Sequence, residues 1–212
     1  MGTPVRPLTP AERRASLQRL HRRMRRCRRC LELGCSIVPP AIFTGGIAAR
    51  IMVVGQAPGG REVEAGRPFH AQSGRRLFQW LAQAGFEEDT FRRTQYMTSV
   101  TKCFPGKAAA GGGDRRPTRI EVEACLPYLA EQLALIRPAL VIPVGTLAIE
   151  AFFADRPALE VVIGTQREID GRVVIPLPHP SGASRWHQIP ANRKRISRAL
   201  RLIEKQRHRL GL

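Results

Sequence analysis

The sequence predicts an α/β protein, a three-layer α/β/α sandwich around a central, mostly parallel sheet of four strands. Segments with strand and helix character alternate along the chain, and such alternation is typical of parallel strands joined by helices that cover both faces of the sheet. Two short apolar runs, at 50–54 and 138–144, lead directly into glycines. That pattern is typical of buried strands that run into a turn.

A basic segment at about 11–30 gives the first helix signal. Leu17, Leu20 and Met24 recur there at helical spacing, and nine arginines lie between positions 13 and 29. The pattern predicts a basic amphipathic helix. The plainer alternatives are a merely solvated face or an arginine-rich base composition of the genome.

The other elements follow in order. The first strand is expected at 50–54, and apolar residues at helical spacing predict a helix over 73–84. Residues 95–100 have high strand propensity. The remaining elements show the same patterns and are expected as follows: a helix at 119–136, a strand at 138–144, a helix at 146–153, a strand at 172–177 and a basic helix at 191–209. The alanine- and glycine-rich segment 108–113 is expected to be a flexible loop.

Length and composition allow one domain over residues 1–212, because 43% hydrophobic content is typical of a globular chain. No run reaches the roughly 18 apolar residues that would cross a bilayer, and no apolar segment follows the first methionine as in a secretory signal. We therefore expect a cytoplasmic monomer with no membrane association. The formal charge of +18 favours a polyanion such as nucleic acid as the partner.

Four of the five cysteines form two distant groups, Cys27 with Cys30 and Cys103 with Cys125. A Cys-x-x-Cys pair completed by two remote thiols can close a four-thiolate site for a metal ion or an iron-sulfur cluster. Such a site would tie the N-terminal segment to the body of the fold, with Cys35 as the spare thiol. A disulfide framework competes with this interpretation, but five cysteines without a signal peptide favour a reducing compartment.

Glycine-rich and polar segments follow three of the expected strands, at 55–59 with 66–69, at 101–105 and at 179–184. The carboxyl ends of parallel strands share one edge of the sheet, where ligands bind. These segments are therefore expected to line one crevice.

With these segments the chain resembles the uracil-DNA glycosylase superfamily, and specifically its iron-sulfur branches, families 4 and 5. One such motif alone would be weak, whereas the ordered set together with the four thiols is specific. The motifs stand in the family's order from about Cys27 to the C-terminal helix: Gly55-x-Ala57-Pro58-Gly59, Glu62, Gly66-Arg67-Pro68-Phe69, Ser73-Gly74, Lys102-Cys103, Cys125-Leu-Pro-Tyr-Leu129, Val144-Gly145 with Ala148, and His179-Pro180.

The resemblance implies a DNA repair enzyme that flips a deaminated base out of DNA and hydrolyses its N-glycosidic bond. Uracil is the first candidate base, and hypoxanthine and xanthine are further candidates. Phe69 would stack on the flipped base, and the four cysteines would hold a structural 4Fe-4S cluster, with zinc as the alternative because ligand identity admits both. The residues expected to form the rest of the base pocket are Gly55, Ala57, Pro58, Gly59 and Ser99, whereas Gln56 is expected among the catalytic residues with His179 and Glu62.

His179 is the expected principal catalytic residue. Departing uracil leaves negative charge on its O2 atom, and a histidine donor on a rigid loop stabilises charge that exists mainly in the transition state. Ser181, Arg185 and Trp186, in the same loop, are expected to contact DNA. Arg185 and Trp186 would enter the space vacated by the flipped nucleotide, as the family's wedge loop does.

Three departures from the family pattern matter for the chemistry. Gln56 stands where family 4 usually has glutamate, and Ser99 stands where family 4 has the asparagine that reads the uracil edge. Family 5 also lacks this asparagine and has a broader base range, so Ser99 moves the chain toward family 5. The carboxylate that family 5 places shortly after its phenylalanine is missing from 70–73. Glu62 is then the nearest candidate to activate water, or else it supports the turn; the alternative function is a non-catalytic iron-sulfur protein that binds DNA damage.

Overall fold

A five-stranded sheet in the order β2-β1-β3-β5-β4 forms the centre of the computed structural model, which describes residues 6, 8–109, 113–181 and 186–212. The strands β1, β2, β3 and β5 run parallel, and β4 pairs with β5 antiparallel. The strands are β1 (Ile51–Gly55), β2 (Tyr96–Ser99), β3 (Leu140–Pro143), β4 (Arg167–Ile169) and β5 (Arg172–Val174). The expected α/β class and mostly parallel sheet are confirmed, with one strand more than the four predicted.

The additional strand β4 is a short edge strand whose first two residues are exposed. It turns into β5 through Asp170 and Gly171, whose φ angles of 49° and 72° are typical of a two-residue hairpin turn. An Asp-Gly pair is itself a hairpin signal, so the sequence does carry a mark of this strand.

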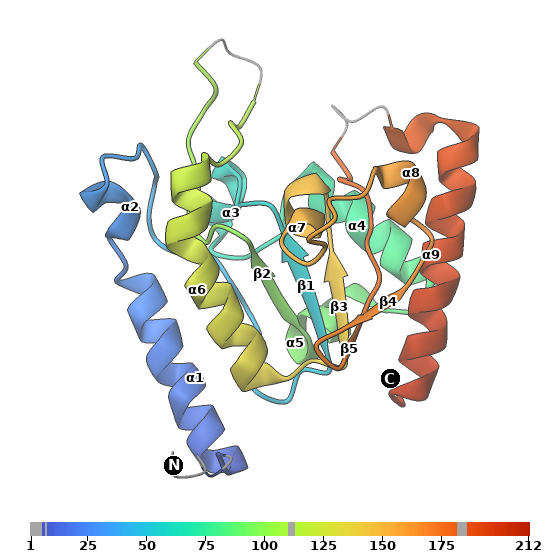
Figure 1. Cartoon of the computed structure of the whole chain (residues 1–212), viewed down its shortest axis with the longest axis horizontal. Coiled ribbons are helices and arrows are strands. Elements are labelled where there is room, and N and C mark those ends of the chain that lie inside the picture. The colour runs from blue at the N-terminus through green and yellow to red at the C-terminus, as the bar shows by residue number, and fades with distance from the viewer. Residues whose placement is uncertain (1–5, 7, 110–112, 182–185) are drawn as a thin grey trace.

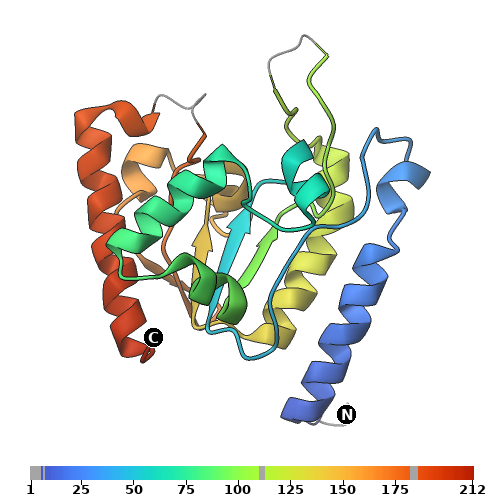
Figure 2. The same ribbon diagram turned by 180° about the vertical axis from the view of Figure 1, so that it is seen from behind.

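Helices cover both faces of the sheet. Figure 1 shows α6 and α7 in front of the strands, and Figure 2 shows α4 and α5 in front of them from the opposite side. The helices are α1 (Pro10–Arg25), α2 (Arg29–Glu32), α3 (Gly60–Ala65), α4 (Gln72–Gln83), α5 (Glu88–Thr94), α6 (Arg119–Ile136), α7 (Thr146–Glu150), α8 (Leu159–Val162), the 3-10 helix η1 (Trp186–Gln188) and α9 (Pro190–Arg209). The three-layer arrangement is therefore confirmed.

The helix α1 confirms the amphipathic pattern but ends at Arg25, before the first cysteine. Its apolar residues are buried, whereas most of its arginines are exposed. Arg13 donates hydrogen bonds to the carbonyls of Leu135 and Ile136 at the end of α6, where a cation also complements the helix dipole. The helix α1 is thereby packed along α6 (Figure 1).

The carboxyl ends of the parallel strands lie at the upper edge of the sheet in Figure 1. The turn after β1, the segment after β2 and the segment that follows β5 all begin at this edge. None of the helices in the described part of the chain combines the length and apolar character that a membrane crossing requires.

Candidate functional site

A cavity of about 340 Å³ opens at this edge of the sheet, and its size falls within the range of about 300–1,000 Å³ that is usual for ligand sites. It brings together most of the predicted site residues. Those that line it are Gly55, Gln56, Ala57, Pro58, Gly59, Glu62, Phe69, Ser99, His179 and Ser181. The predicted crevice is thus present, and segments far apart in the sequence supply its walls.

Phe69 lies close against the end of β1. A Cβ atom on Gly55 would come within 2.9 Å of the Phe69 ring, and one on Gly74 would come within 1.8 Å of the Phe69 carbonyl oxygen. Only glycine at both positions allows the aromatic ring and its backbone to lie where they do. Phe69 itself has a φ of 52°, a left-handed conformation that is costly for a bulky residue.

Arg92 in α5 holds this backbone in place, and the sequence reasoning missed it. Its guanidinium donates to the carbonyls of Pro68 and Phe69 at 2.9 and 2.6 Å. It also pairs with Glu88 at 2.8 Å and lies 4.3 Å from the centre of the Phe78 ring. In the sequence, Glu88 and Arg92 look like an ordinary surface pair at i,i+4, so nothing there indicates a role at the pocket.

His179 has a defined orientation and charge. Its Nδ1 accepts the backbone N–H of Ser181 at 3.2 Å, so the neutral ring carries its proton on Nε2. Burial lowers the pKa of His179, and the charge of Arg116 lowers it further, although Glu62 acts in the opposite direction. The ring is therefore neutral at pH 7 and can donate a hydrogen bond from Nε2.

Glu62 supports the two loops of the pocket. The side chain is buried, with 7% of its surface exposed. One oxygen accepts the N–H of Gly59 at 2.9 Å, and the other accepts the N–H of Ala71 at 3.3 Å. These contacts favour the supporting role over that of the group that activates water.

A second carboxylate, Asp114, also lines the cavity. Its Oδ2 lies so near Gly59 that a Cβ there would be 2.7 Å away, and its Oδ1 pairs with Lys107 at 2.7 Å. The sequence pointed to Glu62 once the carboxylate expected within 70–73 proved to be missing. Asp114 was not predicted, because it lies in a loop more than 40 residues further on, with no motif around it.

Ser99 presents an acceptor rather than a free hydroxyl. Its Oγ donates to the carbonyl of Thr101 at 2.7 Å, so its proton is already used. The Ser99 carbonyl in turn accepts a hydrogen bond from Lys102 Nζ. The side chain therefore cannot make the paired donor and acceptor contacts of an amide.

The expected DNA-contacting residues do not all lie at the cavity. Ser181 lines the cavity, whereas Trp186 lies outside its lining and donates its indole N–H to Glu160. Arg185 lies outside the described residues.

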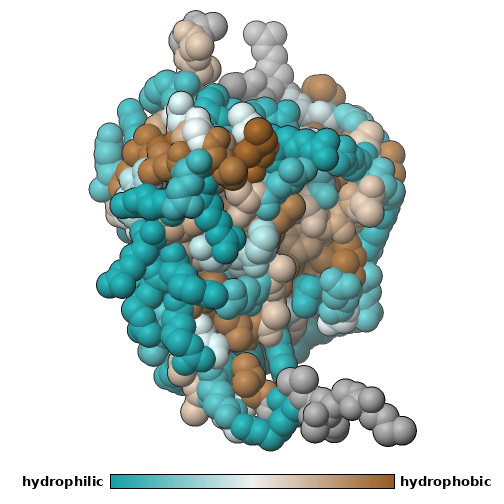
Figure 3. Space-filling view, turned by 60° about the vertical axis from the view of Figure 1, so that its left-hand side comes forward, coloured by the Kyte–Doolittle hydropathy of each residue, from teal (hydrophilic) through white to brown (hydrophobic). Residues whose placement is uncertain are grey.

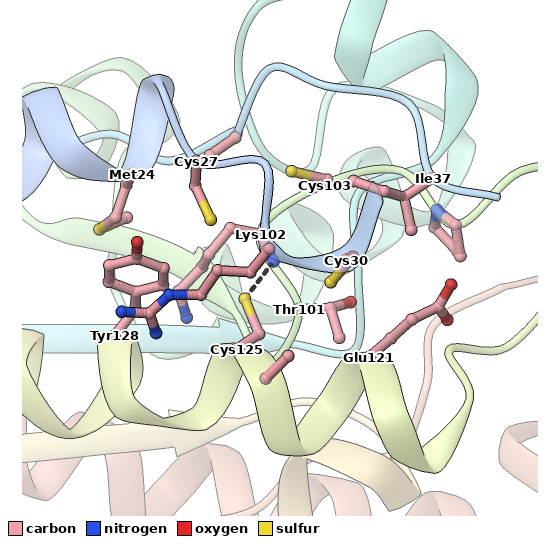
Figure 4. Close-up of a pocket in the computed structure, with 14 residues that line it drawn as sticks. Met24, Cys27, Cys30, Ile37, Thr101, Lys102, Cys103, Glu121, Cys125 and Tyr128 are labelled. Carbon is pink, nitrogen blue, oxygen red and sulfur yellow. Dashed lines mark hydrogen bonds between the residues drawn. The ribbon is translucent and has the colours of Figure 1, made fainter. Parts of the chain in front are cut away.

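The four predicted cysteines line one cavity from three segments (Figure 4). Cys27 and Cys30 come from the region of α2, Cys103 follows β2, and Cys125 lies in α6. All are free thiols, so the described structure does not support a disulfide framework. Cys35 lies outside the lining, although its N–H donates to the Cys30 carbonyl at 2.8 Å.

Burial disfavours the thiolate form of these cysteines. Burial raises the pKa of Cys30 to about 11 and that of Cys103 to about 12, and the neighbouring thiols add to both shifts. Burial also raises the pKa of Cys125, which Lys102 partly offsets. Thiolates at this place therefore need a cationic group among them.

The four thiols match the ligand type of two groups. A structural zinc ion and a 4Fe-4S cluster each take four cysteine thiolates. Among the described residues, no three His, Cys, Asp or Glu side chains come together as the ligands of a single metal ion. The thiols around the shared cavity therefore agree in number and type with either group.

Comparison with known proteins agrees with this site. The chain matches the uracil DNA glycosylase superfamily over residues 43–202 and therefore belongs to that superfamily. It is 40% identical over 101 residues to a Type-4 uracil-DNA glycosylase of Pyrobaculum aerophilum, covering 48% of this chain and 46% of that protein.

Two further relatives extend the comparison. A Type-4 uracil-DNA glycosylase of Thermotoga maritima is 33% identical over 140 residues, covering 65% of this chain and 67% of that protein. A Type-5 uracil-DNA glycosylase of Pyrobaculum aerophilum is 36% identical over 124 residues, covering 52% and 50%. The matched segments thus span about half to two thirds of these curated relatives.

Proposed function

We propose that this chain is a DNA repair glycosylase that removes uracil from DNA by hydrolysing its N-glycosidic bond. The observation that carries the proposal is the meeting of Phe69 and a neutral His179 in one cavity of a superfamily member. An aromatic ring offers stacking of about 1–3 kcal/mol to a flipped base. The Nε2–H of His179 offers a donor to the oxygen on which charge develops as the base leaves.

Water attacks the sugar carbon C1′ while the bond from C1′ to the base breaks, and the electron pair leaves with the base. The attacking water gives up one proton to a carboxylate of the cavity, and the departed base anion takes up one proton to become the free base. Glu62 and Asp114 are the carboxylates that line the cavity. Because both oxygens of Glu62 already accept backbone N–H groups, we assign the orientation of water to Asp114. Glu62 then maintains the shape of the cavity.

The base range is proposed to be broad. The Ser99 hydroxyl proton is used by the Thr101 carbonyl, so Ser99 does not impose the paired contacts by which an amide would select uracil. A base that leaves a buried amide unpaired would lose about 1–3 kcal/mol. Hypoxanthine and xanthine are therefore further proposed substrates.

Cys27, Cys30, Cys103 and Cys125 are proposed to hold a 4Fe-4S cluster, which would serve as a structural cross-link between α2, the segment after β2 and α6. The free thiols around one cavity support this proposal. Metal and sulfide analysis of anaerobically purified protein tests it. Iron and sulfide in similar amounts are expected, and stoichiometric zinc without iron would contradict the cluster.

DNA is the proposed partner, and we propose that the chain acts on it as a monomer and as one domain. Figure 3 shows mostly hydrophilic side chains along α1, below a mixed surface with hydrophobic patches, and the exposed arginines at α1 include Arg19, Arg22 and Arg26. Such charges release counterions when they meet phosphates. The salt dependence of DNA affinity measures this contribution.

The second candidate function is a non-catalytic protein that binds DNA damage. The use of both Glu62 oxygens by backbone groups favours it. A release assay with uracil, hypoxanthine and xanthine, in single and double strands, separates the two. Free base supports the glycosylase, whereas tight binding without any release supports the binding protein.

A further inference from the structure

A second cavity, of about 330 Å³, lies between α4 and α9, and we refer to it as the α4–α9 pocket. Figure 2 shows these two helices side by side. Arg76 lines the pocket from α4, Arg193 and Ser197 line it from α9, and His187 lines it from η1. None of these side chains lines the cavity that holds Phe69 and His179.

His187 is buried in the wall of this pocket and has a fixed orientation there. Only 7% of its surface is exposed, and its ring lies edge-on to Trp80 with centroids 6.1 Å apart. Its Nε2 contacts the Arg76 guanidinium, which can only donate. The ring is therefore neutral with its proton on Nδ1, and that nitrogen is buried without a partner in the described structure.

The cations of the pocket are held by neutral groups. Arg193 donates from Nε and from one terminal nitrogen to the Gln188 carbonyl at 3.0 and 2.8 Å. Among the described residues, no carboxylate forms an ion pair with Arg76 or Arg193. The first turn of α9 also carries no acidic residue.

Burial lowers the pKa of His187, and the charges of Arg76 and Arg193 lower it further. Two guanidinium groups thus act on one neutral ring with no described anion to balance them. Such a field favours an anion with several acceptor oxygens, and guanidinium groups suit phosphate in particular.

We infer that the α4–α9 pocket binds a backbone phosphate of the DNA strand that flanks the flipped base. This inference rests on the proposed function, because it assumes DNA at the crevice. His187 follows His179 by eight residues, so the two lie at most about 28 Å apart along an extended chain. Each DNA strand carries a phosphate about every 3.4 Å, which places the contact within about eight nucleotides of the target base.

The test compares Arg76→Gln and Arg193→Gln with Arg75→Gln. Arg75 is the neighbouring exposed residue of α4, so its variant loses the same charge outside the pocket. Affinity is measured at several salt concentrations for a duplex with about ten base pairs on each side of the target and for duplexes shortened stepwise to about three.

For the long duplex, each pocket variant is expected to lose about tenfold in affinity and about one unit of the salt slope. As the flanks are shortened from about ten base pairs, the difference between the wild type and the pocket variants should disappear at the flank length, at most about eight nucleotides, that no longer reaches the contacted phosphate. Arg76→Lys keeps the charge and should retain the slope. Thermal melting of each variant shows whether it is folded.

Pocket variants that behave like Arg75→Gln on the long duplex would overturn the inference while leaving the proposed function intact. A second result would also overturn the inference. If inorganic phosphate raises the melting temperature of the wild type at matched ionic strength, and duplex length has no effect on the pocket variants, the pocket binds a free phosphate ion. A wild-type protein that binds none of the duplexes would contradict the proposed function itself.

Discussion

Phe69 lies at the cavity in a backbone conformation that a bulky side chain disfavours. Its φ of 52° persists because neighbours fix both of its ends. Arg92 binds the carbonyls of Pro68 and Phe69, and Glu62 binds the N–H of Ala71. The family motif indicated the aromatic residue, but the residue that positions it lies in another helix, and only the structure reveals it.

Replacing Arg92 with Gln should slow base release about tenfold or more, because two hydrogen bonds from a charged donor are worth about 1.5–3 kcal/mol each. If Arg92 acts through the ring, the same change in a Phe69→Ala background should cost little further. Single-turnover rates of the two single variants and the double variant measure this coupling. Arg93→Gln, next to it in α5, is the matched control and should leave the rate unchanged; equal losses in both backgrounds would contradict the positioning role.

His179→Ala is expected to lower the single-turnover excision rate by about 100- to 1000-fold, the effect of losing one donor to a developing anion. DNA affinity should change little. Because the pKa of His179 is lowered from its ordinary value, the neutral donor is already present at pH 7. The rate should therefore not fall between about pH 7 and pH 8 through this group, and a loss there would point to a cationic histidine.

Ser99→Asn should sharpen the preference for uracil. The amide would supply the donor and acceptor that the Ser99 hydroxyl, bound to the Thr101 carbonyl, does not. Release of uracil and hypoxanthine is compared at equal DNA concentration in both proteins. A wild type that releases uracil but neither hypoxanthine nor xanthine would show that another residue selects the base.

At the scale of elements, the helices and strands with a strong apolar period were predictable. The helix expected at 119–136 has those bounds in the structure, and the buried strand at 138–144 contains β3. The short elements were missed for a physical reason. Helix α5 has seven residues with only Phe91 buried, and β4 is stabilised by its pairing with β5 rather than by an apolar pattern.

Contacts between elements add a pH dependence that the sequence does not show. Gln132 of α6 donates to the Tyr96 hydroxyl, so Tyr96 of β2 can donate to His21 of α1, where the two atoms lie 2.8 Å apart. Burial, with a contribution from Arg25, lowers the pKa of His21 from 6.5 to about 4. His21 is therefore neutral in the folded protein and must gain a proton on unfolding below pH 6.5.

The folded protein should lose stability as the pH falls from about 6.5 to about 4, because the unfolded state binds the extra proton. His21→Gln removes this titration and should flatten the dependence of the melting temperature on pH in that window. Thermal melting across the window measures it, with His208→Gln as the control for an exposed histidine. Identical slopes in wild type and His21→Gln would contradict this account of His21.

At the scale of the whole molecule, the sequence predicted the edge of the sheet at which the site lies, since three motif-bearing segments follow parallel strands. It did not predict Arg92 or Asp114. Both come from outside the motifs, and their roles follow from three-dimensional contacts with Phe69 and Gly59. The charge of +18 indicated a polyanion as the partner. Arg76 and Arg193 in the α4–α9 pocket are two of the positive charges, and we infer that they bind a DNA phosphate.

The proposed removal of uracil is tested by base release from a duplex with one uracil, measured beside a duplex with thymine at the same position. Wild-type protein in excess is expected to release free uracil and leave an abasic site, which alkali cleaves at that position, while the thymine strand stays intact. Binding of the uracil duplex with no uracil released, by protein shown to be folded by thermal melting, would contradict the glycosylase and leave the damage-binding protein as the function.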